Sequence, residues 1–211
     1  MRGLLWNVSG KRADMKLDPL FDALPPEDYE LGTPLTLFGF VNGLRPEEPG
    51  AVQLLTDEDF LVARGVMIDH DLYNDTRRDN DTTWLFGDTF ELMFQIRGHE
   101  DYYEFHSTPE GYRLQLHIPD YRTIRSIPHE QKVCESGLQV QNRIDPEKHL
   151  WKCELRIPFS GIGLHRDELA GSRFVIVRQN YTHGKPAQVI TATRVFPQTA
   201  HTPYLWHTVR N

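Results

Sequence analysis

The chain has 211 residues, of which 39% are hydrophobic, 11% aromatic and 25% charged. This composition is typical of a globular protein and excludes an intrinsically disordered chain. The formal net charge of -7 argues against binding to phosphate backbones or anionic lipid, because both attract basic surfaces. No apolar run approaches the ~20 residues that a membrane-spanning helix requires. We therefore expect no nucleic-acid partner and no membrane, and we expect a neutral or cationic ligand.

The N-terminal segment and the cysteines bear on the cellular compartment. The first residues, MRGLLWNVSGKRADM, contain a short apolar patch but neither the apolar core nor the cleavage site of a signal peptide. We expect the protein to be cytoplasmic, or exported with a signal that has been removed. Cys134 and Cys153 are the only cysteines and lack a CxxC spacing, so we expect free thiols.

Two regions are predicted along the chain. Residues 1–34 are expected to form an irregular extension that packs on a single domain of residues 35–211. Pro25, Pro26 and Pro34 disfavour long regular elements in the extension. In the domain, turn-forming Pro and Gly residues recur at short intervals, as a series of short strands requires.

Runs of alternating apolar and polar residues fill the domain. They cover residues 35–41, 51–55, 60–68, 90–96, 102–108, 111–118, 138–144, 151–157, 173–181 and 188–196. In the run 90–96, the apolar residues that share one face are Phe90, Leu92, Phe94 and Ile96. In the run 151–157 they are Trp151, Cys153, Leu155 and Ile157. Such alternation indicates antiparallel strands with one buried face, and a short helical turn is expected after Pro158.

These runs predict an all-β fold. The natural arrangement is a two-sheet antiparallel β-sandwich, immunoglobulin-like or jelly-roll-like, with the irregular N-terminal extension. Ligands of such a fold bind on loops at one end or on a concave sheet face.

An acidic loop follows the run 60–68. Its sequence from Asp69 to Thr83, DHDLYNDTRRDNDTT, carries Asp69, Asp71, Asp75, Asp79 and Asp81 with two arginines. Clustered carboxylate oxygens are ligands that calcium prefers, although the spacing is not that of an EF-hand. The alternative is a solvated loop whose charge the arginines neutralise.

The stretch WLFGDTFELMF, residues 84–94, is the most informative part of the sequence. Asp88 and Glu91 are three residues apart on an extended chain, so they point to opposite sides of the sheet, which weakens a catalytic pair around one glycosidic bond. Glu91 lies on the polar face, where it could accept hydrogen bonds from sugar hydroxyls. The alternatives are core packing for Trp84 and a structural salt bridge for Glu91.

Other catalytic signatures are absent from the sequence. There is no HExxH, no GxSxG and no phosphate-binding loop, and GIG at 161–163 is too short for a nucleotide-binding fingerprint. None of the ten histidines has metal-ligand spacing to a cysteine or a second histidine.

The order of these segments resembles the family 9 carbohydrate-binding modules over about residues 35–210. The matching residues are Asp69, Trp84, Gly87-Asp88, Glu91, Tyr103-Glu104-Phe105, Pro109-Glu110-Gly111, Trp151, Glu154 and Ile157-Pro158-Phe159. The resemblance implies a β-sandwich that binds terminal or reducing-end sugars of polysaccharides without cleaving them. It also implies a role in polysaccharide catabolism beside polysaccharide-degrading enzymes, and structural calcium.

The resemblance also implies roles for particular residues. Trp84 matches the first of two aromatic rings that hold a sugar between them, and Glu91 matches the acid that follows it. Arg97 is a candidate hydroxyl donor, and Asn180 and Tyr181 fall where polar ligand contacts are expected. The second ring would come from Tyr204 or Trp206. Asp69 matches an acidic position of the family, and Asp69 and Asp71 are the candidate metal ligands.

Three alternatives stay open on the sequence alone. The wider DOMON-like group, which the chain also resembles in outline, binds haem through Met and His, and Met67 and Met93 are available. A glycoside hydrolase or lyase could use Asp88, Glu91 or Glu104. Finally, the chain could be a structural accessory domain whose aromatic residues are all core.

Overall fold

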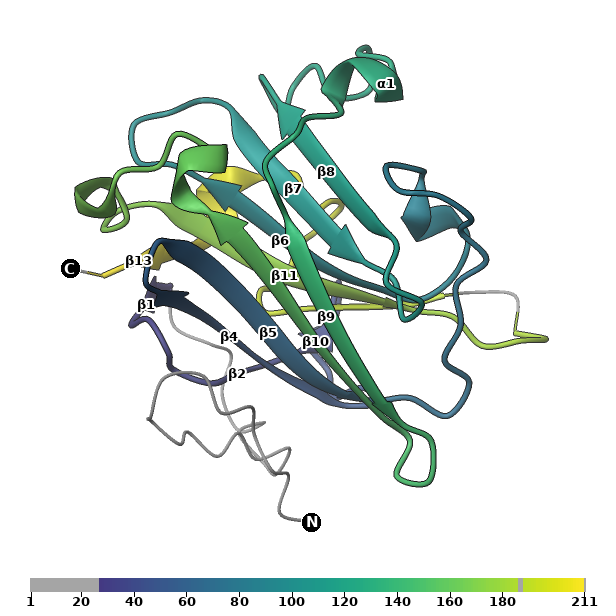
Figure 1. Cartoon of the computed structure of the whole chain (residues 1–211). Coiled ribbons are helices and arrows are strands. Elements are labelled where there is room, and N and C mark those ends of the chain that lie inside the picture. The colour runs from purple at the N-terminus through teal and green to yellow at the C-terminus, as the bar shows by residue number, and fades with distance from the viewer. Residues whose placement is uncertain (1–26, 186–187, 211) are drawn as a thin grey trace.

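The computed structural model describes residues 27–185 and 188–210, which form two β-sheets packed face to face (Figure 1). The strand order is β1-β13-β11-β6-β7-β8 in the larger sheet, where β12 also pairs with β11 and β3, and β2-β4-β5-β10-β9 in the smaller sheet. Neighbouring strands are antiparallel, except that β1 runs parallel to β13. Neither sheet closes into a barrel, so the predicted all-β sandwich is confirmed.

The strands have the following bounds. The larger sheet contains β1 (Asp28–Tyr29), β3 (Phe38–Gly39), β6 (Thr89–Gln95), β7 (Tyr102–Ser107), β8 (Arg113–Ile118), β11 (Arg173–Asn180), β12 (Val189–Ala192) and β13 (His207–Val209). The smaller sheet contains β2 (Leu35–Thr36), β4 (Gly50–Asp57), β5 (Phe60–Ile68), β9 (Gln139–Asp145) and β10 (Leu150–Pro158).

Helical structure among the described residues is limited to short pieces. The α-helix α1 spans His129–Lys132, and single 3-10 turns cover Thr83–Leu85, Phe159–Gly161, Arg166–Glu168 and Pro203–Leu205. The turn at Phe159–Gly161 confirms the helical turn expected after Pro158. None of the helices in the described ranges has the length and apolar character needed to span a bilayer.

The main core lies between the two sheets, as the alternation predicts. All four apolar residues of the run 151–157 are completely buried there, and so are Phe90, Leu92 and Phe94 of β6. The sheets approach closely at Gly65 of β5, where an added Cβ would lie 2.8 Å from the Phe90 ring. Glycine is therefore the residue that lets the ring of Phe90 fill this part of the core.

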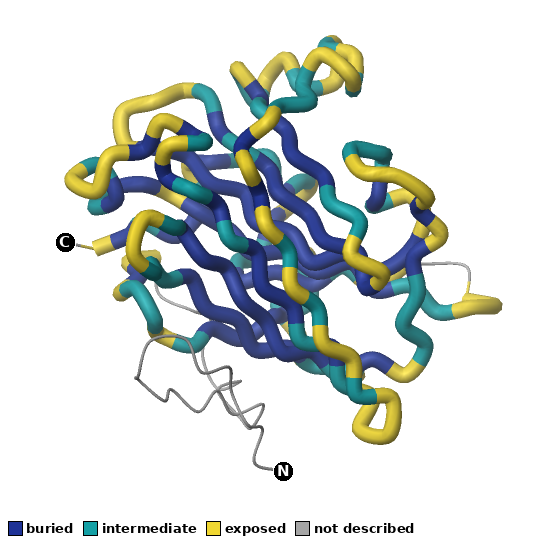
Figure 2. Tube along the Cα trace, in the orientation of Figure 1, coloured by how far each residue is buried: buried dark blue, intermediate teal, exposed yellow. Residues whose placement is uncertain are grey.

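The outer face of the larger sheet is also buried under apolar residues, which differs from the expectation of a second face that is wet or packed on polar groups (Figure 2). Residues 119–136 and 193–206 contribute Tyr121, Ile124, Val133, Phe196 and Trp206 to a second apolar cluster on this face. Met93 of β6 and Val175 of β11 belong to the same cluster. Irregular segments therefore form a third layer, because the apolar residues on this face must be covered.

The predicted runs differ from the observed strands at the ends of the domain. The run 35–41 divides into β2 in the smaller sheet and β3 in the larger one, so the chain crosses between sheets at Leu37. β1 and β13 are too short to show an alternation, and no run predicted them. β1 falls within the predicted extension 1–34, whose residues 1–26 lie outside the described residues.

Candidate functional site

A tight turn places Trp84 over the outer face of the larger sheet. Trp84 lies in the 3-10 turn Thr83–Leu85, and Gly87 then carries the chain into β6 with φ of 147°. A Cβ at Gly87 would lie 2.3 Å from the carbonyl oxygen of Tyr73, so a side chain cannot be accommodated at this crossing. The local sequence therefore fixes how the turn sits relative to β6.

The side chain of Trp84 is half-buried and is not enclosed by aliphatic groups alone. Its ring meets the His106 ring edge-on, with centroids 5.9 Å apart, and the His129 ring at 5.8 Å. The next two residues, Leu85 and Phe86, are 61% and 40% exposed. An apolar, aromatic surface thus reaches solvent at this point.

Beneath Trp84, three polar side chains from β6 and β7 converge. Glu91 is directly opposite His106 in the antiparallel pair, and Glu104 is two residues before His106 on the same face. Glu104 Oε1 lies 2.7 Å from His106 Nε2, and Glu91 Oε1 lies 3.8 Å from His106 Nδ1. All three side chains are almost fully buried.

Neighbouring hydroxyl and amide groups hold this polar cluster of Glu91, Glu104 and His106. Thr89 Oγ1 donates a hydrogen bond to Glu91 Oε1 (2.6 Å), and Gln179 Nε2 of β11 donates to the same oxygen (2.8 Å). Thr83 Oγ1 and His106 Nδ1 are hydrogen-bonded at 2.8 Å. The cluster is therefore held in a fixed geometry by three strands and the turn that carries Trp84.

The segment 193–206 brings one more imidazole to the cluster. His201 Nδ1 is hydrogen-bonded to the hydroxyl of Tyr102 at 2.7 Å and lies 3.9 Å from Glu104 Oε2. His201 is partly exposed, unlike the cluster itself. The site thus consists of the buried polar cluster, with the ring of Trp84 and the partly exposed His201 nearer to solvent.

Electrostatics make the cluster an ion pair. Burial disfavours the charged form of Glu104, but the imidazoles of His201 and His106 outweigh it and hold the pKa of Glu104 below its usual value. Burial also disfavours protonated His106, but Glu91 and Glu104 outweigh it and raise the pKa of His106. Both directions favour a protonated His106 between two carboxylates.

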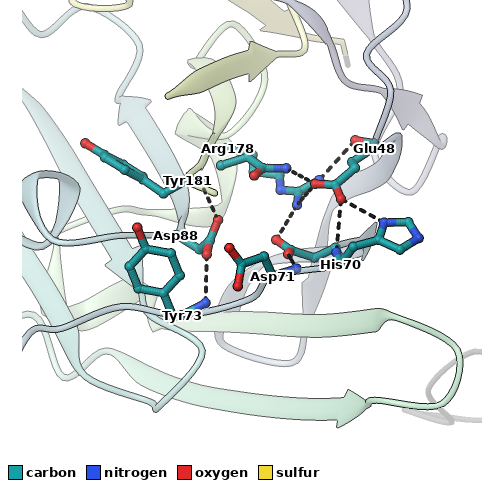
Figure 3. Close-up of polar contacts among 9 residues, drawn as sticks. Glu48, His70, Asp71, Tyr73, Asp88, Arg178 and Tyr181 are labelled. Carbon is teal, nitrogen blue, oxygen red and sulfur yellow. Dashed lines mark hydrogen bonds and ion pairs between the residues drawn. The ribbon is translucent and has the colours of Figure 1, made fainter. Parts of the chain in front are cut away.

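A second polar network joins the acidic loop to the end of β11 (Figure 3). Arg178 Nη2 donates to Asp69 Oδ2 at 2.6 Å, and both side chains are completely buried. Arg178 Nη1 donates to the carbonyl oxygen of Glu48 at 3.1 Å. Asn180 Nδ2 in turn donates to Glu48 Oε2. Asn180 therefore binds a neighbouring side chain in this network.

Asp88 ties the turn of Trp84 to the loop after β11. Its carboxylate accepts hydrogen bonds from the backbone N–H groups of Tyr73 (2.9 Å) and Tyr181 (3.0 Å), as Figure 3 shows. The hydroxyl of Tyr181 donates to the carbonyl oxygen of Trp84 at 2.7 Å. Burial and the nearby Asp69 raise the pKa of Asp88 to about 8. Tyr181 thus helps to hold the turn that carries Trp84 through its hydrogen bond to the Trp84 carbonyl oxygen.

The predicted calcium ligands do not converge on one point. Asp69 faces Arg178, whereas Asp71 Oδ2 accepts the backbone N–H of His183 at 2.5 Å. Calcium requires about six to eight oxygen ligands, and here a guanidinium already neutralises the buried carboxylate of Asp69. These residues do not fit a calcium site, and calcium binding stays a prediction.

The structure places the other predicted residues away from Glu91. Arg97 follows the far end of β6, about 20 Å along the strand from Glu91 at ~3.3 Å per residue. Trp206 is only 1% exposed and donates from Nε1 to the carbonyl oxygen of Ala200 at 2.6 Å. Tyr204 is 59% exposed and has its ring near that of Tyr121.

The sequence analysis did not identify His106, Gln179 or His201 as site residues. The signal for His106 was present, because alternation on the paired runs 90–96 and 102–108 puts Glu104 and His106 on one face near Glu91. No local pattern could identify His201, since it reaches the cluster from an irregular segment.

The comparisons with known proteins define the fold class. Neither a family model nor a curated protein matches the sequence. Solved structures are similar to it, and the chain has the fold of family 9 carbohydrate-binding modules.

The individual likenesses are at low sequence identity. A protein of Bacteroides uniformis that has been proposed to bind carbohydrate superposes with a TM-score of 0.60 at 13% identity, over 84% of this chain and 85% of that one. A family 9 module of Caldicellulosiruptor kristjanssonii in complex with cellotriose superposes with a TM-score of 0.53 at 13% identity, over 86% of this chain and 90% of that one. A family 9 module from the same organism in complex with glucose superposes with a TM-score of 0.54 at 10% identity, over 83% of each chain.

Proposed function

We propose that this protein binds terminal sugar units of a glucan or related polysaccharide, without cleaving them, at the outer face of the larger sheet. The observation that carries the proposal is the half-buried Trp84 against the ring of His106, whose Nδ1 lies 3.8 Å from the buried carboxylate of Glu91. Two solved structures with this fold hold cellotriose and glucose, which supports a saccharide as the ligand.

The chemistry of Trp84 and its surroundings suits a pyranose ring. The apolar C–H face of a sugar stacks on an aromatic face, and its hydroxyl rim requires charged or polar partners. Trp84 supplies the aromatic face, and Glu91, His106 and His201 supply the partners. Because each sugar hydroxyl must lose its hydration, we expect a dissociation constant of about 10 μM to 1 mM.

The proposal predicts how the sugar ring is held between protein side chains. The ring of Trp84 contacts His106 of the polar cluster, whereas Trp206 is buried. We propose that the partly exposed imidazole of His201 closes the other side of the sugar instead of a second indole. Recognition of the reducing end would then depend on hydrogen bonds from the anomeric hydroxyl to the charged cluster.

Calorimetric titration tests the proposal directly. We expect binding of glucose and cellotriose to the full chain, and weaker binding of the corresponding alditols, which lack a closed reducing-end ring. Trp84→Ala should abolish the heat while leaving the circular dichroism spectrum unchanged. Leu44→Ala, which removes an exposed side chain elsewhere on the surface, is the matched control. Absence of binding across a broad glycan panel would overturn the proposal.

A further inference from the structure

The polar cluster has the composition of a metal site. Glu91, Glu104 and His106 each offer one ligand atom, and these three atoms lie within 4.8 Å of one another. Ligands at ~2.0–2.2 Å from a zinc ion are separated by about 3.2–3.6 Å, so the set closes if side-chain rotations bring Glu91 from the Nδ1 edge of the His106 ring toward Nε2.

An unsatisfied oxygen at the same place is an independent indication of a ligand. The carboxamide of Gln179 lies against Glu91, to which its Nε2 donates. Its Oε1 is buried and has no hydrogen-bond partner among the described residues. A buried carbonyl oxygen without a partner costs ~1–3 kcal/mol, and a half-turn of the carboxamide would offer this oxygen to a cation beside Glu91.

The surroundings also orient the ligands as metal sites require. Thr83 holds Nδ1 of His106, which directs Nε2 toward Glu104, and Thr89 holds one oxygen of Glu91. Ligands in protein metal sites are commonly fixed by such outer hydrogen bonds. His201, 3.9 Å from Glu104, is placed to become a fourth ligand.

We propose that Glu91, Glu104 and His106 bind a divalent transition-metal ion, with His201 as a further ligand. Zn²⁺ suits the set best, because imidazole and carboxylate together match its preferences, whereas Ca²⁺ and Mg²⁺ prefer oxygen ligands alone. The two positive charges of the ion balance the two carboxylates. His106 coordinates through Nε2 as the neutral imidazole, so its proton passes to the solvent when the metal binds.

The metal proposal goes beyond saccharide binding and does not rest on it, although Glu91, His106 and His201 are shared between the two proposed sites. The full chain, freed of metal with a chelator, is titrated with Zn²⁺ in two buffers that differ in ionisation enthalpy. We expect one zinc ion per chain with release of protons, and no binding of Ca²⁺ or Mg²⁺. Replacement of Zn²⁺ by Co²⁺ should give visible absorption bands that added Zn²⁺ removes, a result that needs no variant to fold.

Variants assign the ligands. His106→Gln and Glu91→Gln should each weaken zinc binding at least 10- to 100-fold, and His201→Gln should weaken it less. The matched control is His117→Gln, because His117 is a more exposed histidine on β8 that pairs with Asp101 at 2.5 Å. This control should bind zinc like the unmodified chain.

Two results would overturn the metal proposal. One is the absence of zinc binding and of cobalt bands in the unmodified chain. The other is a zinc affinity that survives in folded His106→Gln and falls in His117→Gln, which would place the ion on the surface. Trp84→Ala separates the two proposals, since it removes the proposed sugar contact and keeps all the metal ligands.

Discussion

Glu91 and His106 face each other across neighbouring strands of the larger sheet, with 3.8 Å between Glu91 Oε1 and His106 Nδ1 and both side chains almost fully buried. Apolar residues such as Met93 and Val175 occupy comparable positions on the same face. A buried ion pair is often no more stable than apolar packing of the same volume, so it is weak evidence for a purely structural role. Departures of this kind from simple packing are common at functional sites.

The two tryptophans proposed from the sequence as sugar platforms should respond differently to truncation. Trp206→Ala should lower the free energy of unfolding by ~3–5 kcal/mol, because it leaves a large cavity in the outer apolar cluster. Trp84→Ala should cost clearly less, since its ring is only half-buried. Denaturant unfolding of both variants measures the difference. Equal losses would indicate that Trp84 is a core residue, as the structural alternative holds.

The backbone at Gly87 should be intolerant of a side chain. In Gly87→Ala the new Cβ would meet the carbonyl of Tyr73 at 2.3 Å, and the residue has φ of 147°. We expect a loss of about 2–4 kcal/mol in unfolding free energy, combining strain and overpacking. Gly98→Ala is the matched control, because Gly98 has φ of 81° with no atom within 4 Å, so only the conformational cost of about 1 kcal/mol applies. Comparable losses in the two variants would refute the steric explanation.

The sequence predicted the sandwich because strand alternation directly reports a buried face. The runs 60–68, 90–96 and 151–157 have this pattern, and each became a central strand of its sheet. β13 and β1 could not be predicted, because strands of two or three residues carry no period. The burial of Glu91 was missed for another reason, since the layer that covers it is irregular.

The candidate site was predictable only in part. Trp84 and Glu91 stand close together in the chain, and the turn between them is visible in the sequence. Arg97 was expected near them by its position after the strand, but an extended strand carries it to the far end of β6. His201 could not be foreseen, because its approach to Glu104 depends on the packing of residues 193–206.

The ion pair between Arg178 and Asp69 should stabilise the acidic loop without calcium. Arg178→Met should lower the free energy of unfolding by ~3–5 kcal/mol, because it leaves the carboxylate of Asp69 buried without its partner. The double variant Arg178→Met/Asp69→Asn should recover part of the loss. Lys148→Met, which breaks the exposed pair with Asp145, should cost only about 0–1 kcal/mol.

The same ion pair leads to an expectation for calcium. The melting temperature of the metal-free chain should be unchanged by excess Ca²⁺, because Arg178 already neutralises Asp69. Differential scanning calorimetry with and without added Ca²⁺ measures this. A clear rise in melting temperature with Ca²⁺ would instead support the calcium site that the sequence predicted, and would show that other oxygens complete it.

The raised pKa of Asp88 should make the protein less stable as the pH rises. Burial and the charge of Asp69 raise the pKa of Asp88 from 3.8 to about 8, despite the hydrogen bonds from Tyr73 and Tyr181. Between these two values the folded chain holds a proton that the unfolded chain has lost. The resulting stability is fully present below the unfolded pKa and is lost as the pH rises through about 8.

Unfolding by denaturant between pH 5 and 9 tests this sign. We expect the free energy of unfolding to fall across that range, and His106, whose pKa is also raised, acts in the same direction. Asp88→Asn should flatten the dependence, because the variant has no carboxyl to titrate at this position. Asp75→Asn changes an exposed carboxyl of the same loop and should leave the slope unchanged. A slope that is the same in Asp88→Asn as in the unmodified chain would mean that Asp88 is already ionised at pH 5, held so by its two backbone hydrogen bonds.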